Sequence, residues 1–131
     1  MITMSNYGHS RTVELSYPEA VERVTQTLKE QGFGILTQID VKATLKEKLG
    51  VDFPNYLILG ACNPTYAHKS LQLETELGLL LPCNVIVYED EGQTRVAMLK
   101  PTAALGIVGN PELDRFAQEV EAKVKQAIDQ V

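Results

Sequence analysis

The chain has 131 residues, 44% of them hydrophobic and 22% charged, which is typical of one globular domain with a core of its own. Its formal net charge is −5, and its lysines and arginines are dispersed. Nucleic acids and membrane surfaces are therefore not expected as ligands, because phosphate binding needs a basic stripe. No stretch is apolar over the length of a membrane span and no secretory signal is recognisable, so we expect a cytoplasmic protein.

The first elements are predicted from alternation and capping signals. Residues 1–10 are expected to form a flexible N-terminus, and residues 11–131 a single α+β domain. Residues 11–16 alternate between apolar and polar side chains, which predicts a half-buried strand. The segment Ser16-Tyr17-Pro18-Glu19 is typical of a capping box that opens a helix, and Gly32 is expected to end that helix.

A second strand and a short helix follow. Residues 33–39 alternate again and predict a strand. Residues 41–49 carry a single apolar stripe, which predicts a helix capped by Asp40 and closed by Gly50.

The middle of the chain holds two apolar runs. Residues 56–62 and residues 83–89 have the pattern of strands covered on both faces. Between them, Asn63 and Pro64 form a cap followed by a favoured first helical residue, so we expect a helix over 64–77 with Gly78 as its stop.

The last third of the chain predicts a hairpin and a long helix. Residues 89–92 form the turn, and residues 95–100 the partner strand. Residues 101–109 are expected to be a loop with at most one helical turn. From Asn110-Pro111 an amphipathic helix runs to the C-terminus.

The resulting order is β-α-β-α-β-α-β-β-α. It predicts an α+β fold with a mainly antiparallel five-stranded sheet and helices on one face. Strands that are apolar on both sides would leave an apolar patch on the helix-free face. Such patches usually mark an interface, so we expect a homodimer.

Four segments together resemble the bacterial and archaeal family called domain of unknown function 302. They are Gly32-Phe33-Gly34, residues 39–46, Leu59-Gly60-Ala61-Cys62-Asn63-Pro64 and residues 79–85. The resemblance covers nearly everything from Arg11 onward. It implies a fold of the TATA-binding-protein-like type, here without DNA binding, and a dimer. It carries no established activity, so no catalytic residue can be transferred from it.

Cys62 is the candidate functional residue, because it directly precedes a helix cap. A thiolate there would face free amides and the positive end of the helix dipole, which lower the pKa of a thiol. The same amides, next to Asn63, would suit an anionic ligand. The structural alternative is that Cys62 is a small buried hydrophobic residue, and for Cys83, which opens an apolar strand beside Asn84, this alternative is favoured.

Whether the two cysteines meet depends on the strand directions. If residues 56–62 and 83–89 are parallel, Cys62 and Cys83 lie at opposite ends of the sheet, too far apart for a disulfide. Geometry therefore argues against a pair within one chain unless residues 79–81 run back along the sheet, and a dimer could also bring the two cysteines together. With His68 they would form a soft-metal site for zinc or copper(I), but an exposed histidine is the more frequent outcome. His9 falls in the N-terminal segment and is discounted.

Three functions remain open. The favoured one is a cytoplasmic dimeric module that binds a small ligand or partner near Cys62-Asn63-Pro64, with Cys62, Asn63, His68, Cys83 and Asn84 as candidate ligand contacts. The second is a thiol enzyme or redox sensor that uses Cys62 as nucleophile. The third is a soft-metal protein with Cys62, His68 and Cys83 as ligands. The sequence specifies no cofactor.

Overall fold

The computed structural model describes residues 5–131, which form an α+β domain. The strands are β1 (Gly8–Val13), β2 (Gly34–Asp40), β3 (Tyr56–Cys62), β4 (Cys83–Asp90) and β5 (Gln93–Leu99). The α-helices are α1 (Tyr17–Glu30), α2 (Val41–Leu49), α3 (Pro64–Leu73), α4 (Pro101–Leu105) and α5 (Pro111–Asp129). Two short 3-10 helices are η1 (Thr75–Leu80) and η2 (Gly106–Val108).

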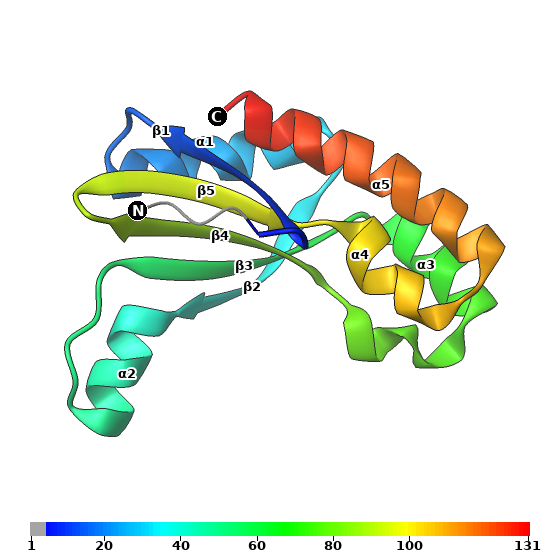
Figure 1. Ribbon diagram of the computed structural model, residues 1–131, viewed down its shortest axis with the longest axis horizontal. Helices are drawn as coiled ribbons and strands as arrows, with labels where there is room; N and C mark the ends of the chain where they lie inside the picture. Colours follow the sequence, from blue (N-terminus) through cyan, green and yellow to red (C-terminus); the bar gives the residue numbers. More distant parts are fainter. Residues whose placement is uncertain (1–4) are drawn as a thin grey trace.

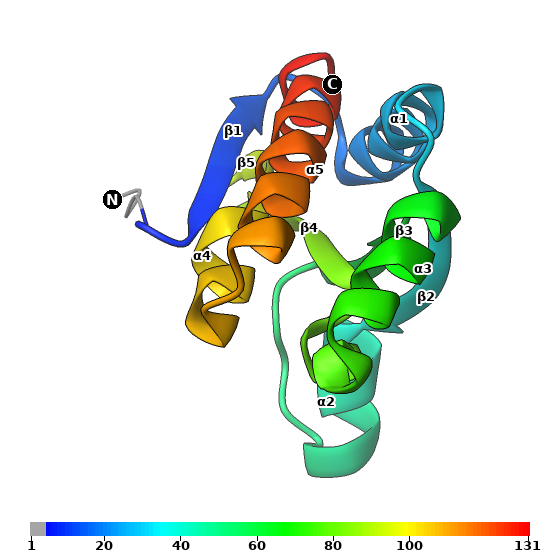
Figure 2. The ribbon, with the colours of Figure 1, turned by 90° about the vertical axis from the view of Figure 1, so that its right-hand side faces the viewer.

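The strands form one sheet in the order β1-β5-β4-β3-β2, and every neighbouring pair is antiparallel. The two long helices α1 and α5 pack side by side across one face of this sheet (Figures 1 and 2). Helices α3 and α4 lie at one end of the sheet, while α2 projects from the opposite end (Figure 1). The predicted fold class is therefore confirmed.

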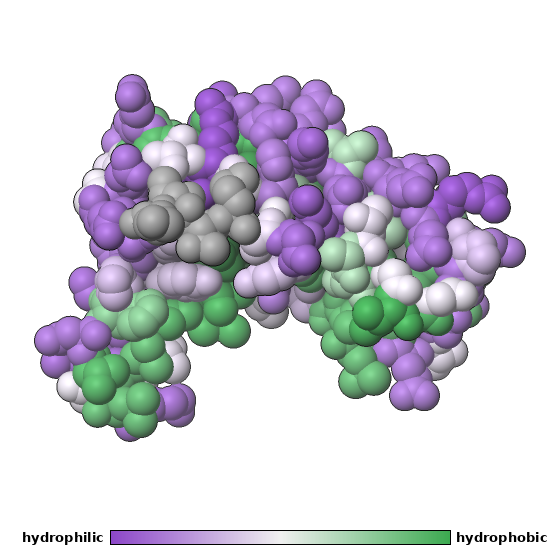
Figure 3. Space-filling model, viewed as in Figure 1, coloured by the Kyte–Doolittle hydropathy of each residue, from purple (hydrophilic) through white to green (hydrophobic). Residues whose placement is uncertain are grey.

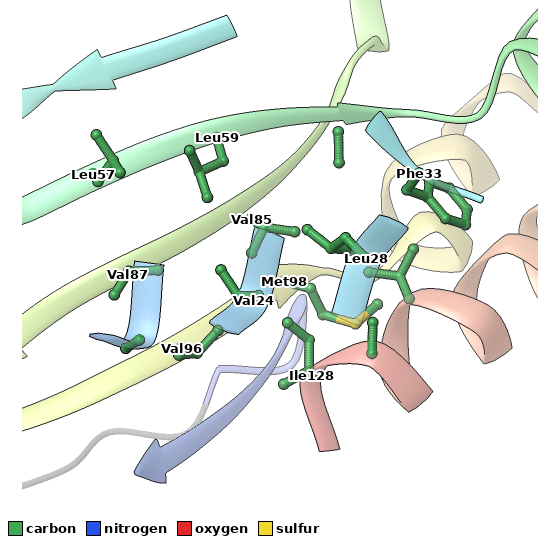
Figure 4. Close-up of a cluster of buried hydrophobic side chains, with 14 of the residues drawn as sticks. Val24, Leu28, Phe33, Leu57, Leu59, Val85, Val87, Val96, Met98 and Ile128 are labelled. Carbon is green, nitrogen blue, oxygen red and sulfur yellow. The ribbon is translucent and has the colours of Figure 1, made fainter. Parts of the chain in front are cut away.

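The core lies between the sheet and the two long helices (Figure 4). Side chains alternate across a strand, so every second residue of the central strands points toward the helices. These inward residues are almost completely buried: Leu57, Leu59, Ala61, Val85, Val87, Val96 and Met98. They pack against Val24 and Leu28 of α1 and against Val124 and Ile128 of α5. This packing fixes the ends of β3 and β4, where the candidate site lies.

The predicted helix caps are present. Ser16 Oγ accepts from the Glu19 amide, and the Glu19 carboxylate accepts from the Ser16 amide, which completes the capping box of α1. Asp40 Oδ1 accepts from the Ala43 amide at 2.9 Å at the start of α2. Gly50 ends α2 in the left-handed conformation with φ +67°.

The first strand begins earlier than predicted. β1 runs from Gly8 rather than from Arg11, and it pairs with β5 from Gly8↔Leu99 to Val13↔Thr94. His9 is therefore part of the sheet, and its Nε2 lies 2.8 Å from Asp129 Oδ1 of α5. Alternation did not reveal this part of the strand because an edge strand needs only backbone pairing. Residues 1–4 of the predicted flexible N-terminus lie outside the described residues.

The predicted helix over 64–77 is shorter in the structure. α3 ends at Leu73, Glu74 is extended with φ −142° and ψ 105°, and Gly78 lies within η1 rather than at a helix end. The Glu74 carboxylate accepts a hydrogen bond from Asn110 Nδ2 at 3.1 Å, so a contact with the start of α5 stabilises the break. The predicted loop 101–109 likewise contains α4 and η2.

Candidate functional site

The two cysteines lie at the same end of the sheet. β3 and β4 are antiparallel, with Ala61 opposite Cys83, so Cys62 and Cys83 are near neighbours across the pair. The parallel crossover, the condition under which the two cysteines would lie far apart, is not the arrangement observed. A parallel crossover needs a helix that returns along the sheet, but α3 packs beyond the strand ends against α5, and η1 leads directly into β4.

The two thiols line one cavity of about 350 Å³ at the junction of β3 and α3. Helix α3 forms one wall, and parts of η1, α4 and α5 contribute the others. The lining is almost entirely apolar and includes Phe33, Leu36, Ala61, Cys62, Tyr66, Ala67, Leu71, Leu81, Pro82, Cys83, Leu105 and Val120. Leu36 and Leu71 are 66% and 39% exposed, so the cavity opens to solvent past aliphatic side chains.

The start of α3 offers no free amide to this cavity. Asn63 Oδ1 accepts from the amides of Thr65 at 3.0 Å and Tyr66 at 3.3 Å. The Ala67 amide donates to the Asn63 carbonyl at 3.0 Å, and Pro64 has no N–H. Since the amides of Thr65, Tyr66 and Ala67 are used internally, neither a thiolate nor an anionic ligand finds a partner among these three.

The pKa of Cys62 moves in the direction opposite to the one expected for a thiolate at a helix start. Burial raises the pKa of Cys62. Burial, and to a smaller extent the proximity of Cys62, raises the pKa of Cys83 to about 11. Desolvation disfavours the charged form, and the cap already satisfies amides that could have stabilised a thiolate at Cys62. Both groups are neutral thiols at pH 7.

His68 and Asn84 do not join the cysteines. His68 is on an exposed position of α3, and Asn84 is exposed on the helix-free face of the sheet, outside the cavity. Within residues 5–131, no three or more His, Cys, Asp or Glu side chains are grouped so that they could hold a metal ion. The structure therefore brings together Cys62, Asn63 and Cys83 from the predicted set, but not a soft-metal trio.

Sequence reasoning missed several cavity residues. Tyr66 and Ser70 follow Asn63 at helical spacing, and Ser70 is 6% exposed, so the periodicity of α3 could have identified them. Leu105 and Val120 come from α4 and α5 and carry no local signal. Only the tertiary fold places them at the cavity.

The architecture is that of an α+β domain with one open antiparallel sheet, and the site is an apolar cavity with two neutral thiols. The family model described as "Domain of unknown function DUF302" matches residues 9–131, so the chain belongs to this family. The resemblance inferred from the four sequence segments is confirmed. No curated protein matches the chain.

A crystal structure of an uncharacterized conserved DUF302 protein from Bacillus stearothermophilus is similar to this chain. The two share 34% sequence identity with a TM-score of 0.91, over 96% of this chain and 98% of the other. Neither the family description nor the description of the crystal structure states an activity. Among residues 5–131, no helix has the length and apolar character that crossing a membrane requires.

Proposed function

We propose that the protein is a binding module for a small apolar molecule, which it holds in the cavity at the β3–α3 junction. The observation that carries this proposal is the lining of the cavity: apolar side chains, two protonated thiols and no free helix amide. A volume of about 350 Å³ falls within the range of small-molecule sites. Such a lining favours an uncharged ligand, because a charged group would lose its hydration without gaining a partner.

The thiol enzyme and the soft-metal protein find less support. A nucleophilic cysteine needs a lowered pKa or a neighbouring base, and both thiols have raised pKa values. The free thiols are consistent with a reducing compartment, and we propose a cytoplasmic location on this ground.

Filling the cavity tests the proposed function. Prodan, a neutral dye whose fluorescence reports an apolar environment, is expected to bind saturably to the native protein. Ala67→Phe places a ring in the cavity and should weaken prodan binding by about tenfold or more, which corresponds to ~1.4 kcal/mol. Ala122→Phe makes the same change on an exposed position of α5 and should leave binding unchanged. Equal binding by the two variants would overturn the proposal.

We further propose that the protein is a homodimer that buries the region of α2. This helix has no buried residue, and Ile39, Leu49, Val51 and Phe53 around it are 37% to 68% exposed. Figure 3 shows hydrophobic surface gathered where α2 projects from the body.

The oligomeric state tests this second proposal. Leu49→Asp should convert the dimer to a monomer in analytical ultracentrifugation, because it places a carboxylate in the proposed interface. Ile107→Asp is the matched control, since Ile107 is 77% exposed and belongs to η2, which directly follows α4 at the end of the molecule opposite α2 (Figure 1). A native protein that sediments as a monomer would contradict the proposal directly.

A further inference from the structure

A buried serine lies in the wall of the cavity at the β3–α3 junction. The residues that α3 and its cap contribute to this wall are Asn63, Tyr66, Ala67, Ser70 and Leu71, which follow the spacing of a single helix face. Ser70 lies near the middle of this face and is 6% exposed. Its Cβ therefore points to the same side as the Cβ of Ala67, and its hydroxyl, one bond further out, faces the cavity.

The Ser70 hydroxyl makes no hydrogen bond to any of residues 5–131. A hydroxyl buried within a helix commonly donates to a carbonyl of the preceding turn. The buried hydroxyl of α1 does so, since Thr27 Oγ1 donates to the Val24 carbonyl at 3.2 Å. Ser70 instead keeps its hydrogen-bonding capacity for another partner.

This hydroxyl can also be reached from the cavity. Among the described residues, Arg95 Nε is the one buried side-chain nitrogen or oxygen that water cannot reach and that has no partner. Ser70 Oγ has no partner either, so it is open to the space that Ser70 lines. A purely apolar ligand would strip water from the hydroxyl and give nothing in return, which is unfavourable. A ligand with one hydrogen-bonding group avoids this loss.

The other polar side chains of the lining indicate which group that is. Cys62 and Cys83 are neutral thiols, which act as weak donors. Asn63 uses its side-chain oxygen for two amides of the helix cap, which leaves only its NH₂ group to offer. The Tyr66 hydroxyl interacts with Glu119, which does not line the cavity. The side chains of the cavity therefore offer mainly donors, and an acceptor on the ligand complements them.

We propose that the ligand of this cavity is an uncharged carbonyl compound, a ketone or an ester with an otherwise apolar skeleton. Its carbonyl oxygen accepts a hydrogen bond from Ser70 Oγ, and its skeleton lies against the aliphatic and aromatic side chains of the lining. This inference rests on the proposed function, because it assigns the chemical class of the molecule that the apolar cavity binds.

A matched pair of compounds tests the assignment. In 2-acetylnaphthalene a C=O group stands where 2-isopropenylnaphthalene has C=CH₂, so the two have nearly the same shape and only the first can accept a hydrogen bond. Equilibrium dialysis measures the affinity of each for the native protein and for Ser70→Ala. We expect Ser70→Ala to weaken binding of the ketone by about fivefold, because one hydrogen bond is lost. The hydrocarbon should bind at least as tightly as before.

Two controls accompany this experiment. Thr65→Val removes a hydroxyl from an exposed position of α3 outside the cavity and should change neither affinity. In the absence of ligand, Ser70→Ala should unfold at the same or a higher urea concentration than the native protein, because the lost hydroxyl has no partner and alanine favours a helix.

Three outcomes would overturn the carbonyl assignment while the proposed function stands. They are an equal loss of affinity for both compounds in Ser70→Ala, no loss for either, and a ligand-free Ser70→Ala protein that is less stable than the native one. The last would mean that the hydroxyl is bonded within the protein. If neither compound binds the native protein, or if Ala67→Phe leaves the binding of both unchanged, the carbonyl assignment and the proposed function fail together.

Discussion

The two faces of the sheet differ in what covers them. On the helix-covered face, Leu59, Val85 and Val96 are fully buried beneath α1 and α5. On the opposite face, Tyr56, Ile58, Ile86 and Tyr88 are only partly buried. The same strands therefore use one face for stability and offer the other for contact. β3 and residues 85–88 of β4 are apolar at nearly every position, although helices cover only one face of the sheet. The partly buried residues on the open face account for the second set of apolar side chains.

The largest expected effect comes from truncating the covered face. Leu59→Ala should lower the free energy of unfolding by about 2–5 kcal/mol, because it leaves a cavity in a tightly packed core. Ile86→Ala, on the open face of the neighbouring strand, should cost about 1 kcal/mol, because the site can relax into solvent. Urea unfolding of both variants measures the comparison. Equal losses would mean that the open face is covered in solution as completely as the other.

The next effect depends on pH and concerns Cys83. Its pKa is raised to about 11 from an ordinary value of 9.0, so the folded state holds this proton more tightly than the unfolded state does. The resulting stability is fully present below pH 9 and is lost as the pH rises toward 11, a total of about 2–3 kcal/mol.

Unfolding at pH 8 and at pH 10.5 measures this loss for the native protein and for Cys83→Ala. Burial also raises the pKa values of Tyr17 and Tyr56, which act in the same direction, so only the difference between the two proteins belongs to Cys83. If the free energy of unfolding fell by the same amount in the native protein and in Cys83→Ala, Cys83 would be more exposed than the structure shows.

A smaller effect probes the close packing where β2 meets β3. A Cβ at Gly60 would lie 2.2 Å from Thr37 Oγ1 and 2.7 Å from Pro82 Cγ. Gly60→Ala should therefore destabilise the protein by about 1–3 kcal/mol through overpacking. Gly34→Ala is the control in the neighbouring strand, because a Cβ there meets nothing within 4 Å. A stable Gly60→Ala variant would show that β2 moves away from β3 at low cost.

Local signals were sufficient to predict most of the fold. The capping box at Ser16, the Asp40 cap, the glycine stop at Gly50 and the Asn63-Pro64 start all depend on residues close in sequence, and each is present as predicted. The failures involve partners distant in sequence. The start of β1 depends on β5, and the end of α3 depends on Asn110 at the start of α5.

For the candidate site, the sequence singled out a segment that lies beside a cavity, but it indicated a different chemistry for the thiol. The Cys62-Asn63 pair does mark a cavity, yet the expected thiolate is disfavoured because Asn63 itself satisfies the amides that would stabilise it. The direction of β4, which brings Cys83 to Cys62, follows from long-range pairing and could not be deduced from strand patterns alone. His68 was included for its metal-ligand chemistry, but its side chain lies on an exposed position of α3.

The most direct test of the account is the rate at which the two thiols of the native protein are alkylated at pH 6 and at pH 8. The central claim is that both are neutral thiols in an apolar cavity. It predicts slow labelling of Cys62 at both pH values, further slowing when prodan is bound, and still slower labelling of Cys83, whose pKa is raised to about 11. Fast labelling of Cys62 at pH 6 would mean an exposed thiolate. That result would contradict the cavity account and favour a thiol enzyme or redox sensor.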